Sequence, residues 1–178
     1  APELDAAVIA RYDRQWVGSH LQRLHQNDLC QTLGIEPGRK YESEGGPTLA
    51  MCCTAVMQHS SKPALDKKRM LEWAVFNVAV GNMDSHAKNL SLLTMGGHTR
   101  LAPFYDLVCT TVYKHLSRRF AFKIGGENRP GWMMGRHWDR LAVELAVKPQ
   151  LLLTIRLDIC LRIERELPKV AGALRAQV

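Results

Sequence analysis

The chain has 178 residues, of which 24 are Lys or Arg and 17 are Asp or Glu, and its formal net charge is +7 at pH 7. Hydrophobic residues make up 46% of the sequence, which excludes an intrinsically disordered polypeptide. A chain of this length buries roughly 70% of the surface that it exposes when unfolded, so it can form one core without disulfide bonds. We therefore expect a single domain over residues 1–178.

The cysteines predict a reducing environment. They are five in number, none stands in a CxxC pair and two are adjacent, which fits neither a disulfide framework nor a tetrahedral zinc site. The sequence has no run of about 18 apolar residues and does not begin with a basic or apolar leader. We expect a cytoplasmic chain without membrane contact. Its positive charge favours phosphates, acidic proteins or nucleic acid as partners, and does not choose among them.

Short elements are predicted in the N-terminal third. Residues 6–12, AAVIARY, are compatible with a buried strand or with the end of a helix, and we favour the strand. Residues 26–33, QNDLCQTL, begin with polar residues and precede Gly34, which is typical of a short helix. The GGP sequence at 45–47 predicts a loop.

The clearest helix is predicted over residues 61–81. Ser60 or Ser61 can cap its N-terminus, and Pro63 suits a first helical turn. Residues suited to burial recur at helical spacing: Met70, Trp73, Ala74 and Asn77. Because apolar residues cover most of its faces, we expect this helix to be central and buried.

A small β region is expected after Gly81. Residues 90–93 and 120–124 resemble strands, and the GG turns at 96–97 and 125–126 lie close to them. The predicted fold is therefore mainly α with a small β element.

Helical periodicity returns near the C-terminus, over residues 137–148 and 151–165, with Pro149 between the two helices. The second helix has a polar stripe of Asp158, Arg162 and Arg165 and an opposite apolar stripe of Leu153, Leu157 and Leu161. We expect Trp132 and Trp138 to be buried anchors, and no chemistry after residue 127.

The densest polar cluster follows the long helix directly, where residues 81–89 read GNMDSHAKN. Asp84 and Asn89 have the spacing D-x4-N, and Asp106 ends an apolar segment farther on. Phosphoryl transfer uses such a set: one Asp faces the attacking hydroxyl, while an Asn and a second Asp hold Mg²⁺ against the phosphates. From these residues alone, a turn capped by Asn82 and its neighbours is an equally good interpretation.

Five segments together resemble a known family, the HipA-type kinases, which are bacterial serine/threonine kinases that serve as toxins of toxin–antitoxin pairs. The segments, in the family's order, are RYDR at 11–14, HQNDLCQTLG at 25–34, GNMDSHAKNLSLL at 81–93, LAPFYDLVCTTVY at 101–113 and AFKIGGE at 121–127. The resemblance implies the helical C-terminal lobe of a protein-kinase-like fold that uses ATP and Mg²⁺.

The same resemblance implies roles for three residues. Asp84 would be the catalytic base, and Asn89 and Asp106 would hold Mg²⁺. From its charge and its place next to Asn89, Lys88 would reach the γ-phosphate, or would only neutralise Asp84.

The resemblance also implies a nucleotide pocket. Tyr12 and Asp13 would lie at the hinge near adenine and ribose, and Gln26, His86 and Tyr105 would line the pocket. The alternative is that both tyrosines are core aromatics and that Gln26 only begins a helix.

The sequence lacks the other half of a kinase site. No glycine-rich loop and strand lysine precede the RYDR segment, and in the family the nucleotide-covering lobe lies on that side. We interpret the chain as an excised domain, a natural remnant or one part of a split system, and expect little or no activity from it alone.

The family further implies a HipB-like DNA-binding antitoxin as partner, operator DNA reached through that antitoxin, and a protein substrate such as an aminoacyl-tRNA synthetase. The alternative function is a non-catalytic module that binds the antitoxin or DNA. A third interpretation, a metal-dependent phosphoesterase, would need further His and Asp residues that the sequence does not supply.

Overall fold

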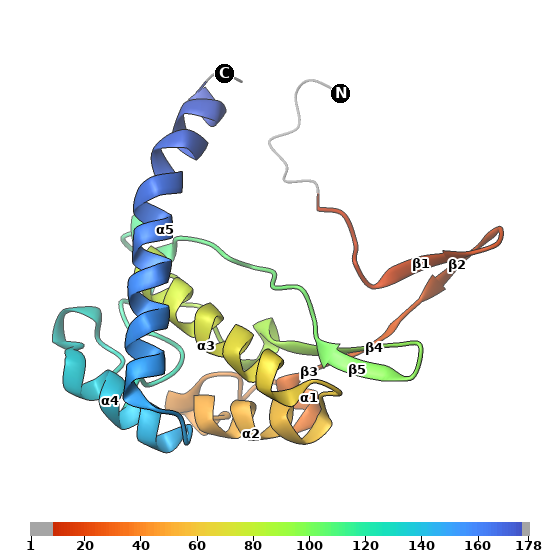
Figure 1. Ribbon diagram of the computed structural model, residues 1–178, viewed down its shortest axis with the longest axis horizontal. Helices are drawn as coiled ribbons and strands as arrows, with labels where there is room; N and C mark the ends of the chain where they lie inside the picture. Colours follow the sequence, from red (N-terminus) through yellow and green to blue (C-terminus); the bar gives the residue numbers. More distant parts are fainter. Residues whose placement is uncertain (1–8, 176–178) are drawn as a thin grey trace.

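The computed structural model describes residues 9–175 and is mainly helical, with two small antiparallel sheets (Figure 1). The α-helices are α1 (Leu29–Thr32), α2 (Leu49–His59), α3 (Pro63–Val80), α4 (Gly135–Glu144) and α5 (Pro149–Arg175). The strands are β1 (Arg14–Val17), β2 (His20–Arg23), β3 (His25–Asp28), β4 (Ser91–Met95) and β5 (His98–Leu101). Four single turns of 3₁₀ helix are η1 (Glu42–Glu44), η2 (Ala87–Asn89), η3 (Thr110–Val112) and η4 (Pro130–Trp132). This agrees with the predicted fold class.

The two sheets have different surroundings. Strands β1 and β2 form a hairpin that projects away from the helices, and its apolar side chains are exposed (Figure 1). The second sheet has the order β3-β4-β5 and lies against the helical part of the molecule. The predicted turn at Gly96 and Gly97 joins β4 to β5, which confirms that part of the expected β region.

Helix α3 is the centre of the core and packs against both α2 and α5 (Figure 1). Its buried residues include Met70, Leu71, Trp73 and Val75, and they join side chains from α2, α4, α5 and the second sheet in one cluster. The prediction of a central buried helix is confirmed. The helix ends at Gly81, whose φ of 75° is in the left-handed region that glycine adopts without strain.

The N-terminal cap of α3 differs from the prediction. Lys62 is the capping residue and makes no side-chain cap. The Ser60 hydroxyl instead accepts a hydrogen bond from the Lys62 amide and donates one to Asp66. Ser61 accepts from the Thr99 amide of β5, so these serines tie the start of α3 to its surroundings.

The helix predicted over residues 26–33 is wrong in its first half. His25–Asp28 is strand β3, and the helix begins only at Leu29. Asp28 caps α1 by accepting from the Gln31 amide, while the Gln31 side chain accepts from the Asp28 amide. The polar start of the segment was a strand because it pairs with β4, a partner more than sixty residues away.

Three other predictions need correction. Residues 6–8 of the strand favoured at 6–12 lie outside the described residues, and the rest of that segment precedes β1 without forming a strand. Residues 120–124 are largely buried but form only one isolated bridge, Ile124 to Glu127, around the Gly125-Gly126 turn. Helix α2 was not predicted, although Thr48 accepts from the Met51 amide and so supplies an ordinary cap signal.

The apolar face predicted for the last helix is also wrong. Helix α5 buries Leu152, Ile155 and Ile159. The three leucines of the predicted stripe are 40%, 56% and 64% exposed: Leu153, Leu157 and Leu161.

The two tryptophans that were predicted to be buried anchors have different environments. Trp138 is buried in α4, as predicted, and Trp132 is exposed, contrary to the prediction. No helix within residues 9–175 has an apolar stretch long enough to cross a membrane.

Candidate active site

The end of α3 and the segment around Asp106 are joined by one buried amide. Asn82 is 1% exposed, and its Nδ2 donates to Asn77 Oδ1 at 2.7 Å and to the Asp106 carbonyl at 3.0 Å. Its Oδ1 accepts from the Asp84 amide at 3.2 Å. Asn82 therefore fixes the backbone of both carboxylate-bearing segments relative to α3.

A second clamp lies beside it. Thr110 accepts from the Met83 amide at 2.8 Å and donates to the Gly81 carbonyl at 3.2 Å. A Cβ at Gly81 would lie only 2.7 Å from Thr111 Oγ1, so the close approach of the two segments also requires this glycine.

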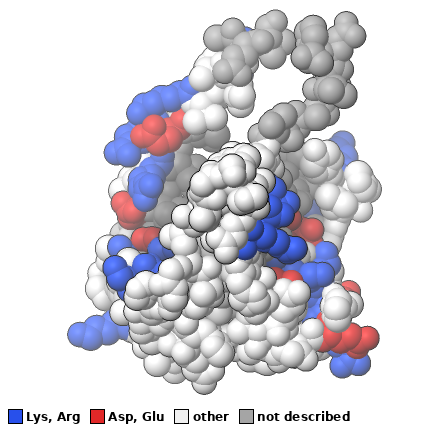
Figure 2. All heavy atoms as spheres, turned by 90° about the vertical axis from the view of Figure 1, so that its right-hand side faces the viewer, with Lys and Arg blue, Asp and Glu red and all other residues white. Residues whose placement is uncertain are grey.

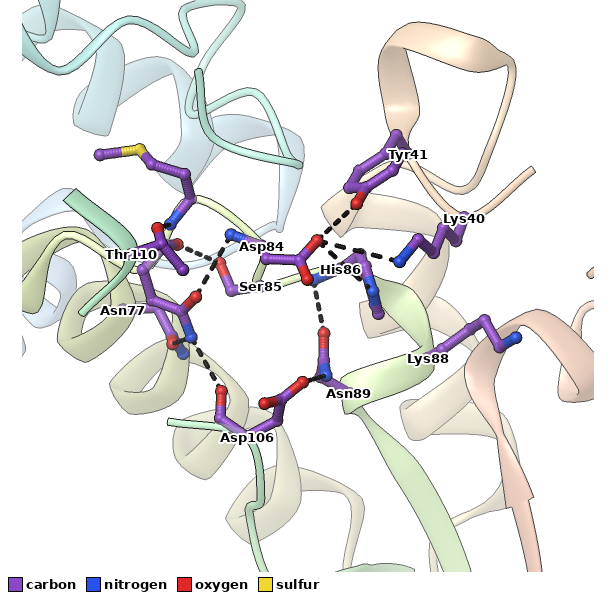
Figure 3. A network of polar contacts seen from close by, with 12 residues as sticks. Lys40, Tyr41, Asn77, Asp84, Ser85, His86, Lys88, Asn89, Asp106 and Thr110 are labelled. Carbon is purple, nitrogen blue, oxygen red and sulfur yellow. Dashed lines mark hydrogen bonds and ion pairs between the residues drawn. The ribbon is translucent and has the colours of Figure 1, made fainter. Parts of the chain in front are cut away.

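The Asp84 carboxylate is the centre of a polar network (Figure 3). Its Oδ1 accepts a hydrogen bond of 2.5 Å from the Tyr41 hydroxyl. Lys40 Nζ lies 3.9 Å and His86 Nε2 lies 3.7 Å from the same oxygen. The side chain is 45% exposed, so it remains accessible to a reacting group.

The protonation of the neighbours suits this arrangement. Burial and the Asp84 charge raise the pKa of Tyr41, which keeps its hydroxyl protonated as a donor. Burial and the nearby Lys40 charge lower the pKa of His86, although Asp84 opposes this, so the imidazole is mainly neutral at pH 7. His86 Nδ1 is buried and has no hydrogen-bond partner among the described residues.

Asn89 and Asp106 meet directly. Asn89 Nδ2 donates to Asp106 Oδ2 at 2.8 Å, and Asn89 Oδ1 accepts from the His86 amide at 2.9 Å. Asp106 has a φ of 58°, an unusual value for a residue with a side chain. Its Oδ1 accepts no hydrogen bond within the described part of the chain, and Asn89 Oδ1 retains a second lone pair.

These oxygens fit Mg²⁺. The ion prefers hard oxygen ligands and commonly takes only one or two from the protein, with waters and substrate phosphates completing its shell. No group of three or more His, Cys, Asp or Glu side chains that could hold a metal occurs in residues 9–175. The fit therefore depends on the Asn89 amide and the Asp106 carboxylate.

Four of the five predicted nucleotide-binding residues line one hollow of about 510 Å³: Tyr12, Asp13, Gln26 and Tyr105. The two tyrosine rings are stacked, with centroids 6.4 Å apart, and Gln26 Oε1 is buried without a partner among the described residues. The Tyr105 hydroxyl donates to the Lys88 carbonyl and lies 2.8 Å from Ser91 Oγ. Burial raises the pKa of Tyr105 to about 12, so this hydroxyl stays protonated.

Asp13 is in this hollow, but its carboxylate is already bound. Arg11 donates to it at 2.6 and 2.8 Å, and Arg14 donates at 2.6 Å. The hydrogen bonds from Arg11 hold the pKa of Asp13 well below its usual range. The Asp13 carbonyl accepts from the Leu24 amide, so the residue fixes the segment that enters the β1-β2 hairpin.

His86 and Lys88 do not lie where their expected roles would place them. His86 packs edge-on against Tyr41, with ring centroids 5.5 Å apart, beside Asp84 rather than in the tyrosine hollow. The Lys88 side chain extends away from Asp84, whereas Lys40 reaches toward it (Figure 3). In this conformation the charge beside Asp84 comes from Lys40.

Lys40 and Tyr41 were not predicted as site residues from the sequence. They stand just before η1, near the GGP loop, and no local pattern marks them as neighbours of Asp84. A Cβ at Gly46 would lie 2.5 Å from the Arg39 carbonyl, so the GGP sequence is the one signal that this loop folds tightly back on itself.

A second hollow opens at Asp84, with a volume of about 350 Å³. Tyr41, Glu44, Met83 and Arg119 are among its lining residues. Asp84 is therefore accessible on a side that does not include the stacked tyrosines.

Comparisons with known proteins identify the family of the chain. The family model described as HipA-like C-terminal domain matches residues 2–167. A Sinorhizobium fredii protein provisionally named kinase Y4mE is 40% identical over 141 residues, which cover 79% of this chain and 34% of that protein. The serine/threonine-protein kinase toxin HipA of Shewanella oneidensis is 30% identical over 144 residues, covering 70% of this chain and 32% of the toxin.

A solved structure of a HipA protein has a similar fold. The complex of Shewanella oneidensis HipA, HipB and operator DNA contains a chain that matches with a TM-score of 0.84 and 26% identity, over 90% of this chain and 41% of that one. The fold is thus that of the C-terminal region of a HipA chain, a kinase-like fold. The present chain spans about a third of the length of these curated relatives.

Proposed function

Because the chain belongs to the family of HipA-like C-terminal domains, we propose that it is the catalytic lobe of a serine/threonine protein kinase, the toxin of a type II toxin–antitoxin pair. The reaction is Mg-ATP-dependent phosphoryl transfer to a Ser or Thr of a protein. The observation that carries the proposal is the meeting of Asn89 and Asp106 at 2.8 Å beside a half-exposed Asp84, since phosphoryl transfer needs these three groups together.

Asp84 acts on the acceptor hydroxyl. Its carboxylate orients the hydroxyl and takes its proton while the hydroxyl oxygen bonds to the γ-phosphorus and the bond to the bridging oxygen of ADP breaks. The Tyr41 hydrogen bond at 2.5 Å holds the carboxylate in position, and the second hollow admits the acceptor side chain. Because catalysis of this reaction is mainly positioning, a fixed carboxylate is more useful than a mobile one.

Asn89 and Asp106 would hold Mg²⁺ through the amide oxygen and the carboxylate. When bound, the ion neutralises the charge that develops on the phosphates. This role requires an accessible carboxylate, and Asp106 is exposed.

The stacked tyrosines belong to the nucleotide end of the proposed site. Tyr12 and Tyr105 offer ring surface for a base, and the unpartnered Gln26 Oε1 offers an acceptor for an amino group. Asp13 contributes through the backbone segment that it fixes, since its carboxylate is bound by two arginines.

We expect the 178-residue chain to bind Mg-ATP weakly and to transfer phosphate slowly by itself. Its sequence has no glycine-rich loop followed by a strand lysine, the parts that clamp the phosphates in other kinases. A lobe that supplies them would be needed for full activity.

The proposal is tested by calorimetric titration of Mg-ATP into the chain and three variants. Asp106→Asn should weaken binding by about tenfold or more, because a charged ligand to the ion is lost. Asp158→Asn, on the exposed face of α5, is the matched control and should bind as the unaltered chain does. Asp84→Asn should retain nucleotide affinity and lose transfer of labelled phosphate to a protein acceptor. Equal binding by the Asp106 and Asp158 variants would contradict the magnesium role.

We also propose a HipB-like antitoxin as the partner, with operator DNA reached through it, and a cellular protein such as an aminoacyl-tRNA synthetase as substrate. Support for the first two comes from the structural relative, which forms a complex with HipB and operator DNA. A non-catalytic binding module is the alternative, and it predicts antitoxin binding that is unchanged in Asp84→Asn together with no transfer under any condition.

A further inference from the structure

A basic groove adjoins the Asp84 hollow and shares no lining residue with the hollow of the stacked tyrosines. It has a volume of about 680 Å³ and is lined by the last residues of α3, by Thr111, Arg118 and Arg119, and by the 129–132 segment. Met83 and Arg119 line both the groove and the Asp84 hollow, so the two are continuous.

Two of the groove's arginines have no carboxylate partner among residues 9–175. The Arg118 guanidinium donates only to the Thr111 carbonyl at 3.2 Å, and the Arg119 guanidinium only to Asn128 Oδ1 at 3.5 Å, among the described residues. Both residues are exposed. Their positive charges are thus available to a ligand.

The third arginine of the groove, Arg129, is paired with a carboxylate and forms part of the groove's lining. Arg129 pairs with Glu127 at 2.7 Å and lies over the ring of Trp132 at 4.1 Å. Trp132 remains 62% exposed, so its ring offers apolar surface to a ligand in the groove.

The end of α3 adds hydrogen-bond acceptors. The Met83 amide donates to Thr110 and the Asp84 amide to Asn82, so the carbonyls of Ala79 and Val80 receive no hydrogen bond from any described residue. Carbonyls at a helix C-terminus need donors from outside the helix. A polypeptide offers backbone N–H donors for them, whereas a phosphodiester backbone does not.

We infer that this groove binds an acidic segment of the protein substrate, whose Ser or Thr enters the hollow at Asp84. The inference rests on the proposed function, because it assigns the occupant to the same reaction. Carboxylates of the segment pair with Arg118 and Arg119, and its apolar side chains cover Trp132. The acidic residues lie beyond the acceptor rather than next to it, because Glu44 and Asp84 line the first hollow.

The test is direct binding of labelled peptides, measured by fluorescence anisotropy without nucleotide. Three peptides of equal length carry one Ser and differ only in a flanking cluster of Asp and Glu, of Asn and Gln, or of Lys. The acidic peptide should bind about tenfold or more tightly than the neutral one. The double variant Arg118→Glu/Arg119→Glu should reverse this order and favour the Lys peptide.

The matched control is Arg162→Glu/Arg165→Glu, which makes the same change in net charge on α5, outside the groove. It should preserve the preference for the acidic peptide. Circular dichroism of each variant separates loss of binding from loss of folding, and reversed preference in the first variant itself requires a folded chain.

Two outcomes would overturn the inference. In the first, Arg118→Glu/Arg119→Glu leaves the order of the peptide affinities unchanged. In the second, a single-stranded oligonucleotide competes with equal affinity and depends in the same way on Arg118 and Arg119. The second would make the groove a nucleic-acid site. Failure of the kinase proposal is distinguishable, because acidic-peptide binding would then persist while Asp106→Asn leaves Mg-ATP binding unchanged.

Discussion

Asp84 is positioned by residues that are distant in the sequence. Asn82 fixes its amide from the same loop, whereas Tyr41, more than forty residues earlier, holds its carboxylate. The hydrogen bond joins a neutral donor to an ionised acceptor, which is the stronger kind. We expect it to stabilise both the carboxylate position and the loop that carries Tyr41.

A double-mutant cycle measures this contact. Tyr41→Phe and Asp84→Ala should show a coupling of about 1 kcal/mol in the free energy of unfolding by urea, less than is usual for a charged hydrogen bond because Asp84 is half exposed. Pairing Asp84→Ala with Tyr113→Phe, at an exposed tyrosine, should be additive within about 0.5 kcal/mol. A coupling near zero for Tyr41 would mean that the contact does not hold the carboxylate.

Gly125 permits a second close approach, between the 125–126 turn and the start of α4. Its φ is 53°, and a Cβ there would lie 1.9 Å from the His137 carbonyl oxygen. Gly126 has a φ of 89° with nothing within 4 Å of such a Cβ. Substituting the two glycines separately therefore distinguishes the cost of backbone strain, which both have, from the cost of a steric clash, which only Gly125 has.

We predict that Gly126→Ala costs about 1 kcal/mol of unfolding free energy, the cost of strain alone. Gly125→Ala should cost at least about 3 kcal/mol, because a backbone carbonyl must also move. Chemical denaturation of both variants is the measurement, and equal costs would show that α4 does not approach the turn so closely.

At the scale of elements, Asp66 joins α3 to β5. Its side chain is fully buried, accepts two hydrogen bonds from Arg100 at 2.8 Å and accepts from the Leu101 amide at 2.9 Å. Burial alone would raise its pKa, but the hydrogen bonds, with that from Ser60, outweigh this effect and lower the pKa to about 2.

This lowered pKa predicts a pH dependence of stability. The stabilising contribution of Asp66 is fully present above its ordinary pKa of 3.8 and is lost as the pH falls through about 2. The shift corresponds to about 2 kcal/mol. Asp66→Asn should therefore destabilise the protein at pH 7. Between pH 4 and 2, the urea midpoint of this variant should change less with pH than that of the unaltered chain.

Glu72→Gln is the control for Asp66→Asn, because Glu72 pairs with Lys68 only on the surface of α3. Asp13 and Glu127 also have lowered pKa values, so the unaltered chain retains other acid sensitivity. If the urea midpoints of the Asp66 variant and of the unaltered chain changed equally with pH, the lowered pKa of Asp66 would be contradicted.

Helix α5 shows why a local pattern is insufficient to identify a buried face. Its sequence offers two apolar stripes, and the face that packs on α3 carries Leu152, Ile155 and Ile159. Arg156 lies over the ring of the buried Trp138 at 4.8 Å, so a charged residue belongs to the packed side. Periodicity established the helix, and its neighbours decided which stripe is buried.

At the scale of the whole molecule, the net charge of +7 does not form one continuous basic surface on the face shown in Figure 2. Lys and Arg lie there in separate groups, several of them beside Asp or Glu (Figure 2). A dispersed charge of this kind attracts nucleic acid without reading its sequence.

We therefore expect the chain alone to bind an operator duplex and a scrambled duplex of equal length with equal affinity, falling steeply with salt. The measurement is anisotropy of both duplexes over a salt series, with and without a HipB-like antitoxin. Operator preference should appear only with the antitoxin. Preference by the chain alone would favour the DNA-binding alternative.

Local sequence determined the elements whose signals lie within a few residues. Helix α3, its end at Gly81, the 96–97 turn and the cluster from Asp84 to Asn89 were all predicted, because capping, glycine conformation and periodicity act over one or two turns. The family resemblance added Tyr12 and Tyr105, whose rings are stacked and line one hollow.

Only the tertiary structure decided which distant groups meet. Strand β3 exists because it pairs with β4, Lys40 and Tyr41 reach Asp84 because their loop folds back, and Arg119 borders the same hollow from a later segment. Pairing, burial and charge proximity depend on separation in space, which a residue's sequence neighbours do not encode.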